Sequence, residues 1–123
     1  MSQIKWEKSL TEKDIAASAE FLRLIFDEKE VERMASKFEK NRHNVQRFKA
    51  KDILRASKTQ LLPETNEDVR AEFVKIVSGK RLVPIALVRR AGHLFIADGY
   101  HRTCAAYYLD KEAEVHCVLV GVE

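Results

Sequence analysis

Residues 81–109 read RLVPIALVRRAGHLFIADGYHRTCAAYYL and contain the strongest secondary-structure signals of the chain. The first part, Arg81–Arg89, is almost continuously apolar, which is typical of a strand with both faces buried. A short polar connection follows, and a second apolar run covers Leu94–Ala97, so we expect the two runs to form a β-hairpin. The sequence then changes to a helical pattern over Tyr100–Leu109. This segment therefore predicts two strands and a helix in direct succession.

Two further helices are predicted before residue 45. Apolar residues recur at intervals of three and four after Thr11, which is a candidate helix cap. A second helix is expected over Glu28–Arg42 with Asp27 as its cap, although one long bent helix fits the same pattern. We expect the apolar stripes of both helices to belong to the core, while the alternative is that this pair mediates homodimerisation. The first stripe consists of Ile15, Ala19, Leu22 and Phe26.

The remaining segments complete a mixed pattern. Lys51–Ala56 is interpreted as a strand or extended segment, and a turn at Leu61–Asn66 precedes a helix over Glu67–Val77. Gly79 is the natural residue to end that helix in a left-handed conformation. Val115–Val120 is the last predicted strand. The fold class is therefore α+β, or mixed α/β, with a small sheet and packed helices.

Size and composition fit one compact unit. The chain has 123 residues, of which 46% are hydrophobic and 33% charged, as in an ordinary globular domain. We expect no membrane segment, because no apolar run approaches the roughly 18 residues that a bilayer crossing needs. We also expect no signal peptide, because the N-terminus is charged and lacks an apolar stretch, and the protein is therefore expected to be cytoplasmic.

Residues 37–58 form a basic segment, with eight lysines and arginines against two acidic residues. Such a segment can meet nucleic acid or an acidic partner, and it can equally be a solvated helix face. The candidate nucleic-acid-binding residues are Lys37, Lys40, Arg42, Arg47, Lys49 and Lys51.

The turn at Asp98-Gly99 combines features of an anion site. A strand ends there, Gly99 permits unusual backbone angles, and the following helix begins with N–H groups that lack internal partners. His101 and Arg102 place cationic side chains in the first helical turn, which is unfavourable for the helix alone and suggests a bound anion. The alternative is structural: Asp98 caps the helix, Gly99 eases the turn and Arg102 pairs with a nearby carboxylate.

These residues resemble the ParB/sulfiredoxin-like family. The resemblance is carried by the apolar strand from Leu82 to Val88, by Phe95 to Arg102 and by Ala105-Ala106, and it covers roughly Phe48 to Val120. It implies a family domain over residues 46–123, preceded by an N-terminal helical extension over residues 1–45. It also implies that the turn binds a phosphate-bearing ligand, namely a nucleoside triphosphate, CTP or ATP, with Mg²⁺. The implied binding residues are Asp98, Gly99, Tyr100, His101, Arg102, Thr103 and Lys75.

Two departures from the family narrow the expected activity. Sulfiredoxins carry a catalytic cysteine between the glycine and the histidine of this turn, whereas this chain has Tyr100 there, and a phenol cannot replace a thiolate nucleophile. ParB proteins continue into a helix-turn-helix region, for which these 123 residues contain no counterpart. We therefore assign no catalytic residue and no metal ligand, and a nuclease acting on the nucleic acid bound by the basic segment is a secondary alternative.

Overall fold

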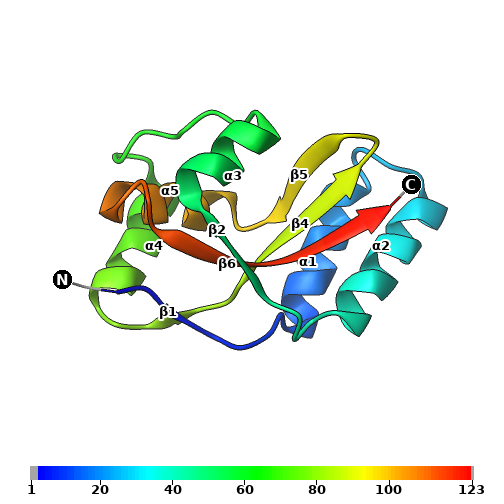
Figure 1. Cartoon of the computed structure of the whole chain (residues 1–123), viewed down its shortest axis with the longest axis horizontal. Helices are drawn as coiled ribbons and strands as arrows, with labels where there is room; N and C mark the ends of the chain where they lie inside the picture. Colours follow the sequence, from blue (N-terminus) through cyan, green and yellow to red (C-terminus); the bar gives the residue numbers. More distant parts are fainter. Residues whose placement is uncertain (1–2, 123) are drawn as a thin grey trace.

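The computed structural model describes residues 3–122, which form a mixed four-stranded sheet with helices on both faces (Figure 1). The strand order is β2-β6-β4-β5, in which β6 runs parallel to β4 and the other neighbouring pairs are antiparallel. The predicted mixed α+β fold and the predicted hairpin, β4–β5, are confirmed. The strands are β2 (Gln46–Lys49), β4 (Ile85–Arg90), β5 (His93–Asp98) and β6 (Glu114–Val122).

Strand β4 is apolar from Ile85 to Val88 because both faces of this part are covered. Ile85 and Leu87 belong to the hydrophobic cluster on one face of the sheet, and Ala86 and Val88 belong to the cluster on the other. All four side chains are at most 1% exposed. The alternation follows from strand geometry, in which successive side chains point to opposite faces.

Helices α1 (Glu12–Leu22) and α2 (Glu28–Lys40) cover one face of the sheet. Thr11 caps α1 in a capping box, and Asp27 caps α2, so the structure has two helices rather than one bent helix. Their apolar stripes pack against β4, β5 and β6 in one cluster, which confirms that the stripes belong to the core. Residues 12–40 are therefore integral to the packing of the sheet.

Three helices pack on the opposite face, namely α3 (Ala50–Ser57), α4 (Glu67–Val77) and α5 (Tyr100–Leu109). The prediction of an extended segment at Lys51–Ala56 is wrong, because this segment lies within α3. Apolar residues spaced by three and one place a single buried side on the helix, which a strand of the same sequence would divide between two faces. These buried residues are Ala50, Ile53 and Leu54.

The apolar run Arg81–Arg89 forms two strands instead of the single predicted one. Strand β3 (Arg81–Leu82) pairs in parallel with β1 (Lys5–Trp6), and β4 begins only at Ile85. The interruption falls at Val83 and the buried Pro84. Proline has no N–H to donate to a neighbouring strand, so the chain changes its pairing partner at this point.

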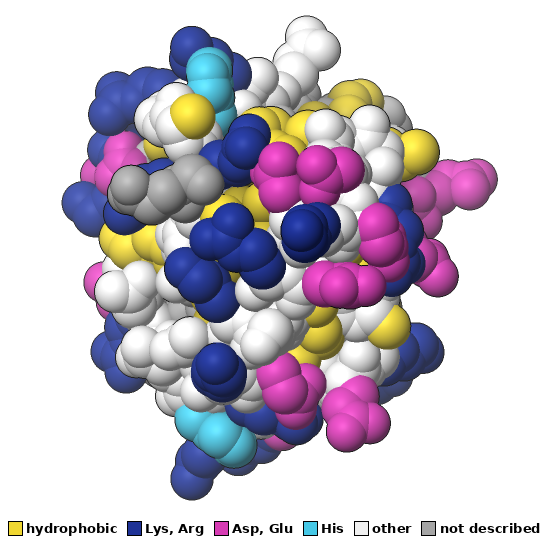
Figure 2. Space-filling view, turned by 90° about the vertical axis from the view of Figure 1, so that its right-hand side faces the viewer, with side chains coloured by type: hydrophobic (Ala, Val, Ile, Leu, Met, Phe, Trp, Pro, Cys, Tyr) yellow, Lys and Arg dark blue, Asp and Glu magenta, His cyan; other side chains and the backbone are white. Residues whose placement is uncertain are grey.

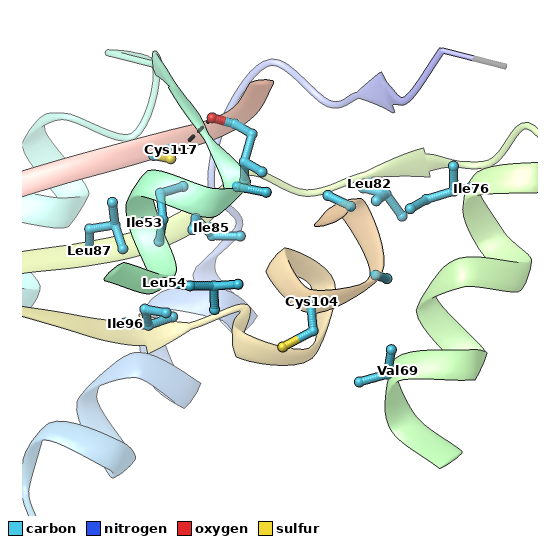
Figure 3. Packing of buried hydrophobic residues seen from close by; sticks show 14 of the residues in the cluster. Ile53, Leu54, Val69, Ile76, Leu82, Ile85, Leu87, Ile96, Cys104 and Cys117 are labelled. Carbon is cyan, nitrogen blue, oxygen red and sulfur yellow. Dashed lines mark hydrogen bonds between the residues drawn. The ribbon is translucent and has the colours of Figure 1, made fainter. Parts of the chain in front are cut away.

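Figure 3 shows the cluster beneath α3, α4 and α5, which contains both cysteines. Cys104 and Cys117 are buried and free. Burial raises the pKa of both thiols, and that of Cys117 reaches about 12. Both therefore serve as small apolar groups in this packing. No helix within residues 3–122 combines the length and the apolar character that a bilayer crossing requires.

Phe38 tests whether the N-terminal helices belong to the cooperative core. This α2 side chain is fully buried against the sheet, so Phe38→Ala should lower the free energy of unfolding by about 3–5 kcal/mol. Urea denaturation followed by circular dichroism measures the change. The exposed Ser36 of the same helix gives the control, and Ser36→Ala should change stability by about 0.5 kcal/mol or less. A separate early transition for the N-terminal helices would contradict a shared core.

Candidate functional site

The turn between β5 and α5 depends on the close approach of Gly99 to β4. Gly99 has φ of 106°, a left-handed conformation that favours glycine. A Cβ atom added at this position would lie 2.3 Å from Cγ2 of Ile85, well inside any real contact. Glycine is therefore required here by backbone conformation and by packing together, which gives it a structural reason independent of any ligand.

Helix α5 begins without a side-chain cap, unlike α1, α2 and α4. Asp98 does not provide the cap that the structural alternative assigned to it. Within residues 3–122, the hydrogen bonds give no protein acceptor to the backbone N–H groups of Tyr100, His101 and Arg102. Such groups at a helix start favour an anion. Thr103 takes no part, since its hydroxyl is buried and donates to the carbonyl of Gly99 at 2.9 Å.

Arg102 is bound to the protein on the side of α4. Its Nε donates to Oε1 of Glu72 at 3.2 Å, and its Nη1 donates to the carbonyl of Val83 at 2.8 Å. Lys75 Nζ lies 2.8 Å from the other oxygen of the same carboxylate, Oε2 of Glu72. The side chains of Arg102 and Glu72 are only 14% and 12% exposed. Glu72 thus stands between two cations, which confirms the alternative in which Arg102 pairs with a carboxylate.

His101 also faces α4, whereas Tyr100 points to a different part of the chain. His101 Nε2 lies 3.7 Å from Oδ2 of Asp68, in a largely exposed pair. The Tyr100 hydroxyl donates to the carbonyl of Gln60, in the connection between α3 and α4. Burial raises the pKa of Tyr100, so its hydroxyl stays protonated and donates at neutral pH. The first turn of α5 therefore joins two segments that precede it in the sequence.

Asp98 lies half-buried at the end of β5, next to Asp14 of α1. Burial raises the pKa of Asp98, Arg102 lowers it, and the neighbouring carboxylates Asp14 and Glu72 raise it further. The net direction is upward, because desolvation is the largest contribution. The Asp98 carboxyl group therefore loses its proton less readily in the folded protein than in the unfolded chain.

The structure brings Lys75 and the turn residues together and shows their carboxylate partners to be Glu72 and Asp68. The sequence analysis considered a carboxylate partner for Arg102 but did not identify which residue it is. Asp68, Glu72 and Lys75 occur at intervals of four and three, so one polar side of α4 was recognisable. Nothing in that spacing shows that this side faces α5. Four hollows in the described residues 3–122 are lined by no residue of the turn.

Five of the six basic candidates lie in α2, β2 and α3, Arg42 lies in the connection between α2 and β2, and they have different partners. Arg42 pairs with Glu39 at 2.9 Å, and Lys51 pairs with Glu112 at 2.8 Å. Lys49 lies 3.8 Å from the same Glu112 carboxylate. Arg47 is an exposed residue of β2, while Lys37 and Lys40 lie on α2. The segment is therefore not one continuous cluster, and its binding to nucleic acid remains a prediction.

Comparisons of this chain with models of known protein families, with curated proteins and with solved structures find no match. The resemblance to the ParB/sulfiredoxin-like family accordingly rests on the residues of the 82–106 segment alone.

Gly99→Ala tests the packing of the turn. The substitution should lower the free energy of unfolding by about 2–4 kcal/mol, because it adds left-handed backbone strain to a collision with Ile85. Gly92 is a matched control, since it has φ of 77° but no atom within 4 Å of an added Cβ. Gly92→Ala should cost only about 1–2 kcal/mol, the backbone contribution. Equal losses in urea denaturation would show that the contact with Ile85 is unimportant.

Asp98→Asn tests the raised pKa of Asp98. With a raised pKa, the folded state holds the proton more tightly than the unfolded chain, so this group lowers stability as pH rises through the window between its unfolded and folded pKa values. Asparagine stays neutral throughout. The stability of Asp98→Asn relative to the unchanged protein should therefore increase as pH rises through that window and then become constant. Urea denaturation from pH 3 to pH 7 measures the difference, and a difference that falls with pH would contradict the assignment.

Proposed function

We propose that the start of α5 binds the phosphate groups of a nucleoside triphosphate or of a similar phosphate-bearing ligand. One observation carries the proposal: the N–H groups of Tyr100, His101 and Arg102 have no protein acceptor in the described residues and stand beside the cationic side chains of Lys75 and Arg102. Backbone donors combined with a helix dipole and an arginine suit phosphate oxygens well. Within residues 3–122, α1, α2 and α4 have side-chain caps. Helix α3 also begins without a side-chain cap and has Lys51 in its first turn, but its first two N–H groups donate to the carbonyls of Ala113 and Lys111.

Glu72 has a specific role in this proposal. Its carboxylate accepts a hydrogen bond from Arg102 and lies beside Lys75. A bound phosphate would need the same contacts with these two cations. Glu72 Oε2 is buried and makes no hydrogen bond of good geometry, although the Lys75 ammonium is 2.8 Å away. Glu72 therefore acts as an internal anion, and a ligand phosphate competes with it for Lys75 and Arg102.

The resemblance to the ParB/sulfiredoxin-like family supports a nucleotide as the ligand, with CTP and ATP as the first candidates. Residues 3–122 contain no group of three or more histidine, cysteine or acidic side chains that could hold a metal ion. Mg²⁺ would thus be held mainly by the nucleotide phosphates, with Asp98 as the nearest carboxyl group of the turn. We further propose that the protein works in the cytoplasm, where two buried free thiols are stable.

Thermal unfolding in the presence of nucleotides tests the proposal. ATP or CTP at one hundred times its dissociation constant should stabilise the protein by about 2.7 kcal/mol, whereas the matching nucleosides should not. Each triphosphate is measured with and without Mg²⁺, and inorganic phosphate serves as the minimal probe. If no triphosphate raises the unfolding temperature at millimolar concentration, the proposal is wrong.

Substitutions around Glu72 locate the binding site. Lys75→Ala should weaken triphosphate binding about tenfold, and Lys111→Ala, an exposed lysine on the α5–β6 connection, should leave it unchanged. Glu72→Gln should strengthen binding, because it removes the competing charge while it keeps the size of the side chain. Arg102→Ala is less informative, since it also removes the contact with Val83 and destabilises the fold. Weaker binding in Glu72→Gln would contradict the competition.

A further inference from the structure

Helix α2 separates its charges into two flanks. Counted at 3.6 residues per turn, Lys29, Arg33, Lys37 and Lys40 fall within about 80° of one another around the helix. Glu28, Glu32 and Glu39 fall within about 40° of one another on the other side of the exposed surface. The buried side between the flanks is formed by Val31, Met34 and Phe38.

A contact with β6 shows which way the basic flank faces. Lys37 Nζ donates to the carbonyl of Gly121 in β6, at 2.5 Å. Lys37 and Arg89 both line an open hollow of about 650 Å³ between α2, the end of β6 and the β4–β5 turn. The basic flank and Arg89 thus form one surface at this end of the sheet. We call it the α2 basic face, and it consists of Lys29, Arg33, Lys37, Lys40 and Arg89.

The charges of the α2 basic face are not neutralised within the described part of the chain. None of its five cations forms an ion pair there, and Lys37 alone has a hydrogen bond, to an uncharged carbonyl. Glu30, the acidic residue next to this flank, is held by Arg90 at 2.9 Å. Arg23 and Arg42 are paired with Glu28 and Glu39 of the acidic flank. The five cations of the α2 basic face therefore have no ion-pair partner among residues 3–122.

The face lacks the apolar anchor that protein partners generally use. The exposed large hydrophobic residues of the described chain all lie outside it. Protein interfaces concentrate aromatic and apolar residues at their centre, whereas contacts with nucleic-acid phosphates need only cations and polar donors. Figure 2 looks onto this end of the molecule, where dark blue side chains spread over the middle and left and magenta ones gather on the right. The exposed hydrophobic residues are Phe21, Leu24, Ile25, Phe48, Val74 and Val77.

We propose that the α2 basic face binds the phosphate backbone of double-stranded nucleic acid without reading its sequence. The cations from Lys29 to Lys40 extend for about 16 Å along α2, over which a duplex presents a phosphate charge about every 1.7 Å of its axis. No exposed aromatic side chain offers a stacking surface for single-stranded bases on this face. The α2 cations of this face lie on the α1–α2 side of the sheet, whereas the α5 site lies with the helices of the other side. Arg89 is at the opposite end of β4 from Ile85, against which Gly99 packs.

Fluorescence anisotropy with a labelled DNA duplex of mixed sequence tests this proposal. Binding is measured over a series of salt concentrations, with Lys29→Gln, Arg33→Gln and Lys40→Gln combined in one variant. All three side chains are exposed and make no contact that the fold needs. The variant should bind about tenfold more weakly or worse at low salt, and the slope of log K against log salt should become shallower by about 2–3, close to 0.9 for each lost phosphate contact.

A second variant separates this face from the overall positive charge. Lys13→Gln, Lys80→Gln and Lys111→Gln remove the same charge from exposed positions on other elements, and they should leave both affinity and slope nearly unchanged. Equal loss in the two variants, or no binding at low salt, would overturn the proposal. A poly-glutamate peptide of similar charge is the competing probe. If it binds as tightly as the duplex, the partner is an acidic protein segment and the assignment to nucleic acid is wrong.

Discussion

Burial of β4 on both faces is the constraint on which the rest of the structure depends. Ile85 and Leu87 need cover from α3, α4 and α5, while Ala86 and Val88 need cover from α1 and α2. A strand with only one covered face would leave half of this apolar surface in water. The same strand supports the candidate site, because Gly99 packs directly against Ile85 and so determines where α5 begins.

Much of the fold was predictable because its signals are local. The apolar runs of the hairpin strands, the helix caps at Thr11 and Asp27 and the left-handed conformation of Gly79 are all determined by residues close by in the sequence. The errors have two causes. Lys51–Ala56 has too few residues for the spacing of its apolar side chains to distinguish helix from strand. Strand β1 forms because it pairs with Arg81–Leu82, a partner that is distant in the sequence.

The candidate site shows the same division between local and distant information. The glycine turn and the cations at the start of α5 were visible in the sequence, and so was the spacing of Glu72 and Lys75 on α4. The pairing of Arg102 with Glu72 was not, because the two residues are 30 positions apart and meet only through the packing of α4 on α5. Pairings of this kind decide whether a cation is free for a ligand, and local sequence patterns do not contain them.

The difference between paired and free cations distinguishes the two proposed sites physically. At α5, the single carboxylate of Glu72 already pairs with both Arg102 and Lys75, so a phosphate must replace these contacts and gains only the difference between the two sets. On the α2 basic face four of the five cations are exposed, Lys37 is partly buried, and none has an ion-pair partner within the described chain, so a polyanion gains through the release of counterions. Affinity at α5 should therefore depend on the geometry of one ligand, whereas affinity at α2 should depend mainly on ionic strength. A protein with both sites could hold a small phosphate ligand and a nucleic-acid backbone at once, because the sheet separates the α2 cations from the start of α5.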